Sequence, residues 1–172
     1  MNLTAFQDAY PEDLSHCFGC GKNNPQGHQL KSYWSSQQTE EGNERESESE
    51  GVEQTFAKFT PDACHTAIPG FVYGGLIASL IDCHGTGSAS AMAYKQAGRA
   101  LGEAPALRFV TGKLEVNFVA PTPLGVELTL IGTFSEIKER KIIVDITLSA
   151  HGKVCAKGQV IAVKMPSSMG AV

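Results

Sequence analysis

Three residues in the segment "PGFVYGGLIASLIDCHGTG" (69–87) are placed to do chemistry: the pair Gly74-Gly75 and the acid Asp82. The glycines stand where an extended stretch gives way to an apolar, helical pattern. The first N–H groups of a helix have no partner inside it, and glycine lets a ligand approach that backbone closely. Such a helix start favours an oxyanion, although the two glycines could also serve only a tight turn.

Asp82 is unusual because it directly follows Leu80 and Ile81 inside the helical pattern. Aspartate is a poor residue in the middle of a helix, and burying its ionised carboxylate without a partner is costly. The position is too deep in the helix for a cap, which leaves an ion pair, a reaction or a solvated outer face. We favour the reaction, because perturbed acids cluster at functional sites.

The spacing of Gly75 and Asp82 predicts a homodimer. They are seven residues apart, which puts them on about the same helix face but about 10 Å apart along the axis. An oxyanion donor and a carboxylate acting on one carbonyl should both lie within about 3 to 4 Å of it. A shared site therefore needs Gly75 of one subunit and Asp82 of another, on antiparallel neighbouring helices.

The element that must position these residues is a helix from Gly74 to about Gly98. Its apolar residues fall near a 3.6-residue repeat, and the small residues from Gly85 to Ala91 allow a sheet to approach closely. The repeat consists of Leu76, Ile77, Leu80, Ile81 and Met92.

The rest of the chain alternates apolar and polar residues, which predicts strands in antiparallel succession. Possible strands precede the helix at Gln29 to Trp34 and in "VEQTFAKF". After the helix, strands centre on Leu114 to Phe118, Val126 to Leu130, Ile142 to Leu148 and Val154 to Val163, with turns at 121–125, 138–140 and 151–152. We therefore expect an α+β fold in which a sheet wraps around one long central helix.

Composition predicts one domain spanning 1–172, with a turn-rich lead-in segment (1–36) and an acidic loop or edge strand (37–50). The chain has 42% hydrophobic and 19% charged residues and no apolar run of about 20 residues, so we expect no membrane span. A net charge of -4 argues against nucleic acid. The N-terminus does not look like a signal peptide, which favours the cytoplasm.

The segments "HTAIPGFVYGGLIASLID" and "FVTGKLEVNFVAPTPLG" together resemble the hot-dog-fold acyl-CoA thioesterases, in the phenylacetyl-CoA thioesterase branch of the 4-hydroxybenzoyl-CoA thioesterase superfamily. The family pattern is a Gly-Gly pair opening the central helix, an Asp seven residues after the second Gly, and a Ser or Thr starting the next strand. The resemblance spans about residues 51–165. The opening "CFGCGKNNPQG" is similar to a less specific lead-in of some members.

The resemblance implies a role for each matching residue. Asp82 would be the catalytic carboxylate, acting as nucleophile or as general base on water. The Gly75 N–H would polarise the thioester carbonyl, and the hydroxyl of Thr111 would position water or the carboxylate. Beyond these matches, we expect Tyr73, Gly74 and His65 to line the substrate pocket, although Tyr73 could serve packing alone. We expect a homodimer or a dimer of dimers. Neither a metal nor an organic cofactor is implied.

The face on which Thr111 lies is open from the sequence. Simple alternation puts Thr111 with Lys113 and Glu115, away from Leu114, whereas a bulge at Gly112 would reverse this parity.

Two departures from the family pattern keep other functions open. Tyr73 stands where many members have His, and Ala67 stands where many have Asn. The alternatives are a non-catalytic acyl-CoA sensor and a hot-dog hydro-lyase acting on enoyl or 3-hydroxyacyl thioesters. A hydro-lyase usually needs a His working with a carboxylate, and His65 has no evident partner.

The five cysteines read as free thiols, because their number is odd and no secretory signal accompanies them. Cys17 and Cys20, with nearby His16 and His28, form half of a zinc motif without a second pair at suitable spacing, so we expect no metal site. Cys83, beside Asp82, is expected to pack rather than to react, because adjacent helix residues point about 100° apart.

Overall fold

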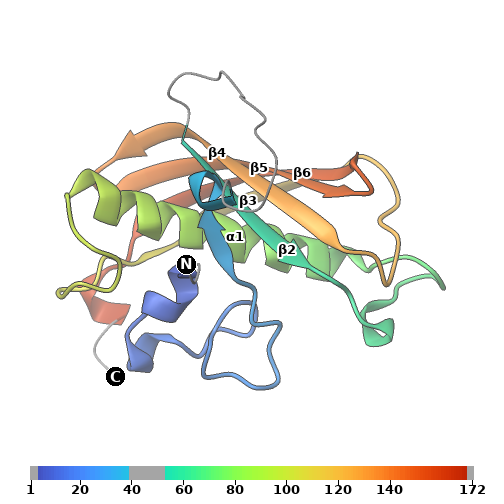
Figure 1. Cartoon of the computed structure of the whole chain (residues 1–172), viewed down its shortest axis with the longest axis horizontal. Coiled ribbons are helices and arrows are strands. Elements are labelled where there is room, and N and C mark those ends of the chain that lie inside the picture. Colours follow the sequence, from blue (N-terminus) through green and yellow to red (C-terminus); the bar gives the residue numbers. More distant parts are fainter. Residues whose placement is uncertain (1–3, 39–52, 170–172) are drawn as a thin grey trace.

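A long helix lies against one face of an antiparallel sheet in the computed structural model of this protein, which describes residues 4–38 and 53–169 (Figure 1). The helix, α1, spans Gly74–Gln96 and ends just before the expected boundary. Within the described residues the sheet has six strands: β1 (Ser32–Trp34), β2 (Gln54–Phe59), β3 (Phe109–Phe118), β4 (Leu128–Lys138), β5 (Lys141–Ala150) and β6 (Lys153–Lys164). Short 3-10 helices lie at Phe6–Ala9 (η1), Glu12–Leu14 (η2), Ser35–Gln38 (η3), Ala63–His65 (η4) and Ser167–Met169 (η5). The α+β architecture is confirmed.

The strand order differs from a simple succession of hairpins. The β4–β5 and β5–β6 hairpins are as expected, and His151 and Gly152 form the second turn with positive φ angles of 50° and 74°. The order β1-β2-β4-β5-β6-β3, however, places β3 beside β6 at a sheet edge. The expected β3–β4 hairpin is wrong because the "PTPLG" segment packs against the chain before α1, where the Leu124 N–H donates to the Gly70 carbonyl at 2.9 Å.

Small residues let the sheet approach α1 closely, as the sequence predicts. A Cβ atom on Gly85 would lie 2.5 Å from the Val160 side chain, and one on Gly158 would lie 2.4 Å from Ile81. Neither position can accept a larger residue without movement of its neighbour. The core between helix and sheet is apolar and includes the fully buried side chains of Leu76, Leu80, Ile81, Met92, Leu128, Leu130, Ile142 and Leu148.

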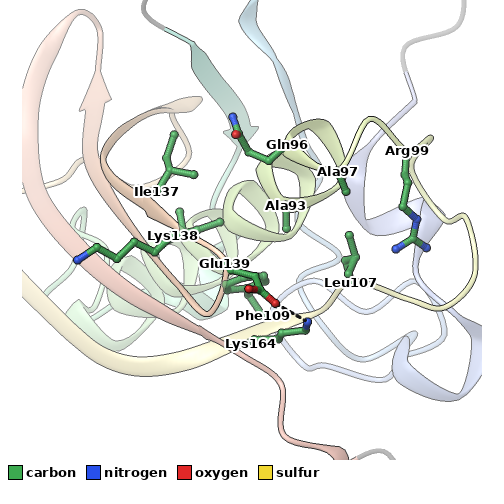
Figure 2. A pocket seen from close by; sticks show the side chains of 11 residues that line it. Ala93, Gln96, Ala97, Arg99, Leu107, Phe109, Ile137, Lys138, Glu139 and Lys164 are labelled. Carbon is green, nitrogen blue, oxygen red and sulfur yellow. Dashed lines mark ion pairs between the residues drawn. The ribbon is translucent and has the colours of Figure 1, made fainter.

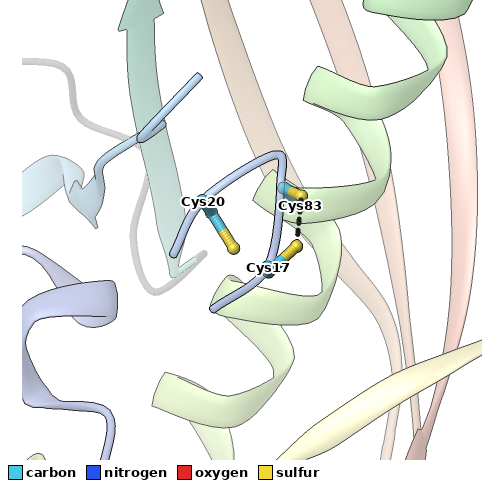
Figure 3. A group of neighbouring side chains, drawn as sticks. All are labelled: Cys17, Cys20 and Cys83. Atoms are coloured by element: carbon cyan, nitrogen blue, oxygen red, sulfur yellow. Dashed lines mark hydrogen bonds between the residues drawn. The ribbon is translucent and has the colours of Figure 1, made fainter. Parts of the chain in front are cut away.

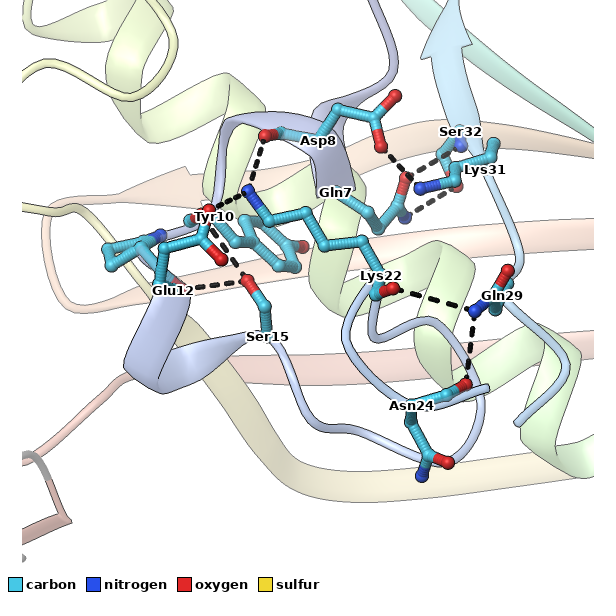
Figure 4. A network of polar contacts seen from close by, with 11 residues as sticks. Gln7, Asp8, Tyr10, Glu12, Ser15, Lys22, Asn24, Gln29, Lys31 and Ser32 are labelled. Atoms are coloured by element: carbon cyan, nitrogen blue, oxygen red, sulfur yellow. Dashed lines mark hydrogen bonds and ion pairs between the residues drawn. The ribbon is translucent and has the colours of Figure 1, made fainter. Parts of the chain in front are cut away.

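The N-terminal segment 4–38 is a packed part of the domain, although its sequence is polar and turn-rich. Tyr10, Cys20 and Leu30 are buried in the main core. Polar contacts join its parts, shown in Figure 4, including two hydrogen bonds between Gln7 and Ser32. Apolar residues scattered among turn residues show no periodicity, so the sequence pattern could not reveal this packing.

Of the acidic stretch 37–50, only the first two residues fall within the described range, in η3. The expected acidic loop or edge strand otherwise lies outside the described residues. In residues 4–38 and 53–169, no helix combines the length and the apolar character that a bilayer span requires.

Candidate active site

The structure brings Asp82 and Thr111 together, although they are 29 residues apart in the sequence. The Thr111 hydroxyl donates a hydrogen bond to Asp82 Oδ1 at 2.5 Å. Asp82 lies on the side of α1 that faces β3, and its side chain is partly buried. The hydrogen bond fixes the orientation of the carboxylate, and the side chain is still accessible. The carboxylate can therefore act in a defined direction on a molecule that binds beside it.

A bulge in β3 is the reason that Thr111 faces the helix. The β3–β6 register shifts between Thr111 and Lys113, so Gly112 is the extra residue. Without the bulge, Thr111 and Val116 would point to opposite faces of the sheet. With it, Thr111 contacts Asp82 while Val116 packs against the core. The sequence left open which face of the sheet Thr111 occupies, and the bulge at Gly112 places it on the face toward α1.

The environment of Asp82 favours its neutral form more than water does. Burial raises the pKa of the carboxyl above its ordinary value, and negative charge at Cys17 adds to this rise. The hydrogen bond from Thr111 lowers the pKa and opposes both effects. A raised pKa increases the basicity of the carboxylate, which suits a general base.

The start of α1 is exposed and has backbone N–H groups available to a ligand. Gly74 and Gly75 are both exposed, and the N-cap residue Tyr73 makes no side-chain hydrogen bond to the first turn. Aromatic rings border it: a Cβ on Gly74 would lie 3.1 Å from Phe118, and one on Gly75 would lie 2.5 Å from the Tyr73 ring. Because Asp82 is nearly two turns further along α1, one chain does not bring it to the Gly75 N–H.

A groove of about 510 Å³ adjoins this helix start. Of the three residues expected to line a pocket, His65 and Tyr73 contribute to this groove, whereas Gly74 is not among its lining residues. The Tyr73 N–H donates to the His65 carbonyl at 3.0 Å. The lead-in adds Phe18 and His28, whose rings are 4.9 Å apart. The His28 ring is 5.1 Å from the His65 ring. Burial lowers the pKa of His28, and His65 lowers it further.

The sequence did not predict that the lead-in would contribute to this groove. Its aromatic residues carry no spacing that ties them to the helix, so only the general similarity of "CFGCGKNNPQG" to some family members pointed there. The same loop brings Cys17 and Cys20 to Cys83 on α1, a group of three thiols that residue spacing also could not reveal.

A second cavity of about 430 Å³ lies at the other end of α1, between the helix C-terminus and the ends of the strands (Figure 2). Its lining includes Ala93, Phe109 and Ile142, and a Glu139–Lys164 ion pair closes one side. Neither Asp82 nor Gly75 lines it, and Ala93 is about 16 Å along the helix from Asp82. This cavity is therefore separate from the residues that the sequence singled out.

Comparisons with known proteins agree with the fold. Residues 69–157 match the family model of the thioesterase superfamily. A solved thioesterase superfamily protein from Shewanella loihica is 48% identical, covers 93% of this chain and 99% of its own, and superposes with a TM-score of 0.62. A solved thioesterase from Haemophilus influenzae shares the fold at 16% identity, covering 67% of this chain and 73% of its own, with a TM-score of 0.55. Curated proteins give no significant match. The hot-dog fold is confirmed.

Proposed function

Because this chain belongs to the thioesterase superfamily, we propose that it hydrolyses an acyl-CoA thioester to the free acid and coenzyme A. The observation that carries the proposal is the contact between Asp82 and Thr111 at the helix–β3 junction. It holds a partly buried carboxylate in one orientation, at the residue where the family pattern has its acid.

In the proposed reaction, Asp82 attacks the thioester carbonyl or removes a proton from the water that attacks it. The Thr111 hydroxyl holds the carboxylate, and the Gly75 N–H of a second subunit stabilises the oxyanion. A new C–O bond forms, the C–S bond breaks, and the thiolate of coenzyme A leaves and takes up a proton. If the attack is by Asp82 itself, water then hydrolyses the acyl-enzyme.

The second subunit is proposed to be another copy of this chain, joined along β3. As the edge strand, β3 presents unpaired backbone groups over ten residues. Exposed apolar side chains surround this edge and the start of α1: Ile68, Phe71, Tyr73, Leu114, Phe118 and Val119. Pairing two β3 edges about a two-fold axis would cover these side chains and set two α1 helices antiparallel. Each Gly75 could then approach the partner's Asp82.

The groove beside the helix start is proposed to bind the part of the substrate beyond the carbonyl. Its lining includes Tyr73, His65, Phe18 and His28. Aromatic walls suit an apolar acyl chain or an aromatic acid.

The hydro-lyase alternative finds no support in the contacts of His65. Its Nδ1 accepts the backbone N–H of Asp62 at 2.9 Å, so the ring is oriented by main chain and not by a carboxylate. The sensor alternative differs from the proposal only in turnover, and the following experiment separates them.

The decisive test compares wild type with Asp82→Asn on a panel of acyl-CoAs, measuring free thiol release. The amide keeps the shape but is neither a nucleophile nor a base, so we expect kcat to fall by about 10² to 10⁴-fold. Asp145→Asn is the matched control, because Asp145 is also a half-buried acid held by one side chain, Gln159, at 2.8 Å. It should leave kcat unchanged. Tight acyl-CoA binding without turnover in wild type would establish the sensor and refute the enzyme.

A further inference from the structure

Three cysteine sulfurs converge where the lead-in crosses α1. The Sγ atoms of Cys17, Cys20 and Cys83 all lie within 4.8 Å of one another. Cys17 Sγ and Cys83 Sγ are 3.8 Å apart. Figure 3 shows the loop of Cys17 and Cys20 passing in front of the helix, with the Cys17 thiol pointing toward Cys83. Cys20 and Cys83 are buried, whereas Cys17 is exposed.

The loop is shaped to present its sulfurs to the helix. The Gly21 N–H donates to the Cys17 carbonyl at 2.8 Å, which closes a tight turn around the Cys-x-x-Cys segment. Gly19 allows the close approach, because a Cβ atom there would lie only 2.3 Å from Cys83 Sγ.

The distances match a metal–thiolate site. Zinc binds cysteine sulfur at about 2.3 Å in a tetrahedron, and a tetrahedral edge is about 1.63 times the bond, so two sulfurs on one zinc lie about 3.8 Å apart. The Cys17–Cys83 separation of 3.8 Å has this value already. A disulfide would need only two of the three sulfurs, at about 2 Å. It would not explain why the third sulfur is directed at the same point.

We propose that Cys17, Cys20 and Cys83 bind one Zn²⁺ ion through their three sulfurs. Water would occupy the fourth position, on the exposed side of Cys17. The three sulfurs bind as thiolates and release their protons, so the zinc unit carries a charge of -1. The guanidinium of Arg108, held over the Tyr10 ring at 3.3 Å, attracts negative charge at Cys20 and would offset this charge. The ion would fasten the lead-in to α1, a structural role that does not depend on the proposed hydrolysis.

The test is a zinc titration of the full chain, with thiols reduced and metals first removed by a chelator. Zn²⁺ is added in competition with a chromophoric indicator, and Cd²⁺ is the second probe because its thiolate complexes absorb in the ultraviolet. We expect one ion per chain, loss of binding in Cys17→Ser and Cys20→Ser, and a higher Tm for the zinc-loaded protein. Far-ultraviolet circular dichroism checks that each variant is folded.

The remaining cysteines provide matched controls. Cys155→Ser changes a buried thiol in β6 and Cys64→Ser an exposed one, and both should keep full zinc binding. Folded, reduced wild type that takes up no zinc would overturn the proposal. An intramolecular disulfide among the three cysteines, seen as a mass lower by two hydrogens in protein that binds no metal, would also overturn it. Asp82→Asn should bind zinc normally, so failure of one proposal is separable from failure of the other.

Discussion

The two sides of α1 differ in how far they are buried, and the consecutive residues Asp82, Cys83 and His84 show this difference. Asp82 points toward β3, where it meets Thr111 in a partly exposed site. Cys83 and His84, each turned about 100° further around the helix, face the lead-in and the strands β1 and β2, where both are buried. The β3 side is open in a single chain, whereas the lead-in side is closed. The proposed reaction lies on the open side, whereas the buried contacts of the closed side stabilise the fold.

The closed side is organised by a chain of buried polar contacts. His84 Nδ1 is 2.9 Å from the Ser32 hydroxyl, and His84 Nε2 is 3.3 Å from the Thr55 hydroxyl. Ser32 is also bonded to Gln7, and Thr55 to Ser88 at 2.7 Å. Each side chain of this network has a partner within it, so the network can be buried without leaving its own polar atoms unsatisfied.

Apart from Asp82→Asn, the largest effect is expected from disrupting the β3 edge on the open side. Val119→Asp places a charge in the exposed apolar patch beside β3, where a partner chain would have to bury it without compensation. We expect a monomer by sedimentation, and kcat lower by about 10² to 10³-fold because the oxyanion donor from the partner is lost. Ile137→Asp is the control, since Ile137 is also an exposed apolar residue but lies on β4. A dimeric, active Val119→Asp protein would refute the composite site.

Removing the hydroxyl of Thr111 is the next test of the open side. Thr111→Ala leaves Asp82 without its hydrogen bond, and a bond to a charged group contributes about 1.5 to 3 kcal/mol, equivalent to about 10 to 10²-fold in rate. The hydrogen bond lowers the pKa of Asp82, so its loss should raise that pKa and move the pH profile of kcat/KM to higher pH. Thr111→Ser keeps a hydroxyl and should restore most of the rate. An Ala variant as active as wild type would remove Thr111 from the mechanism.

The closed side should respond to pH in stability and little in turnover. Burial lowers the pKa of His84 to about 3, so between pH 6.5 and 3 the unfolded chain binds a proton that the folded chain does not. Stability therefore rises with pH in this window and is lost as pH falls. From pH 7 to 5 we expect a loss of about 2 kcal/mol, measured by urea unfolding. In His84→Gln the slope should flatten; an unchanged slope would show that other groups are responsible.

The sequence predicted elements best where neighbouring residues carry the information. The period of α1 and the alternation of β5 and β6 follow from burial of one face. The predicted ends of these three elements are therefore close to the observed ones. The partner of β3 was predicted wrongly, because strand pairing depends on where the chain turns in space. β1 is shorter than the stretch from Gln29 because Gln29 has a positive φ of 51°, which interrupts extended backbone.

By itself, the sequence determined the helix and most of the strands and singled out Gly75 and Asp82, because each depends on residue type and local spacing. Thr111 was singled out by the family resemblance. Only the tertiary structure decided that the bulge at Gly112 turns Thr111 toward Asp82 and that Cys83 meets Cys17. These contacts join residues 29 and 66 positions apart. Their existence depends on how the sheet and the lead-in pack against α1, and that packing comes from the whole core rather than from any short stretch of chain.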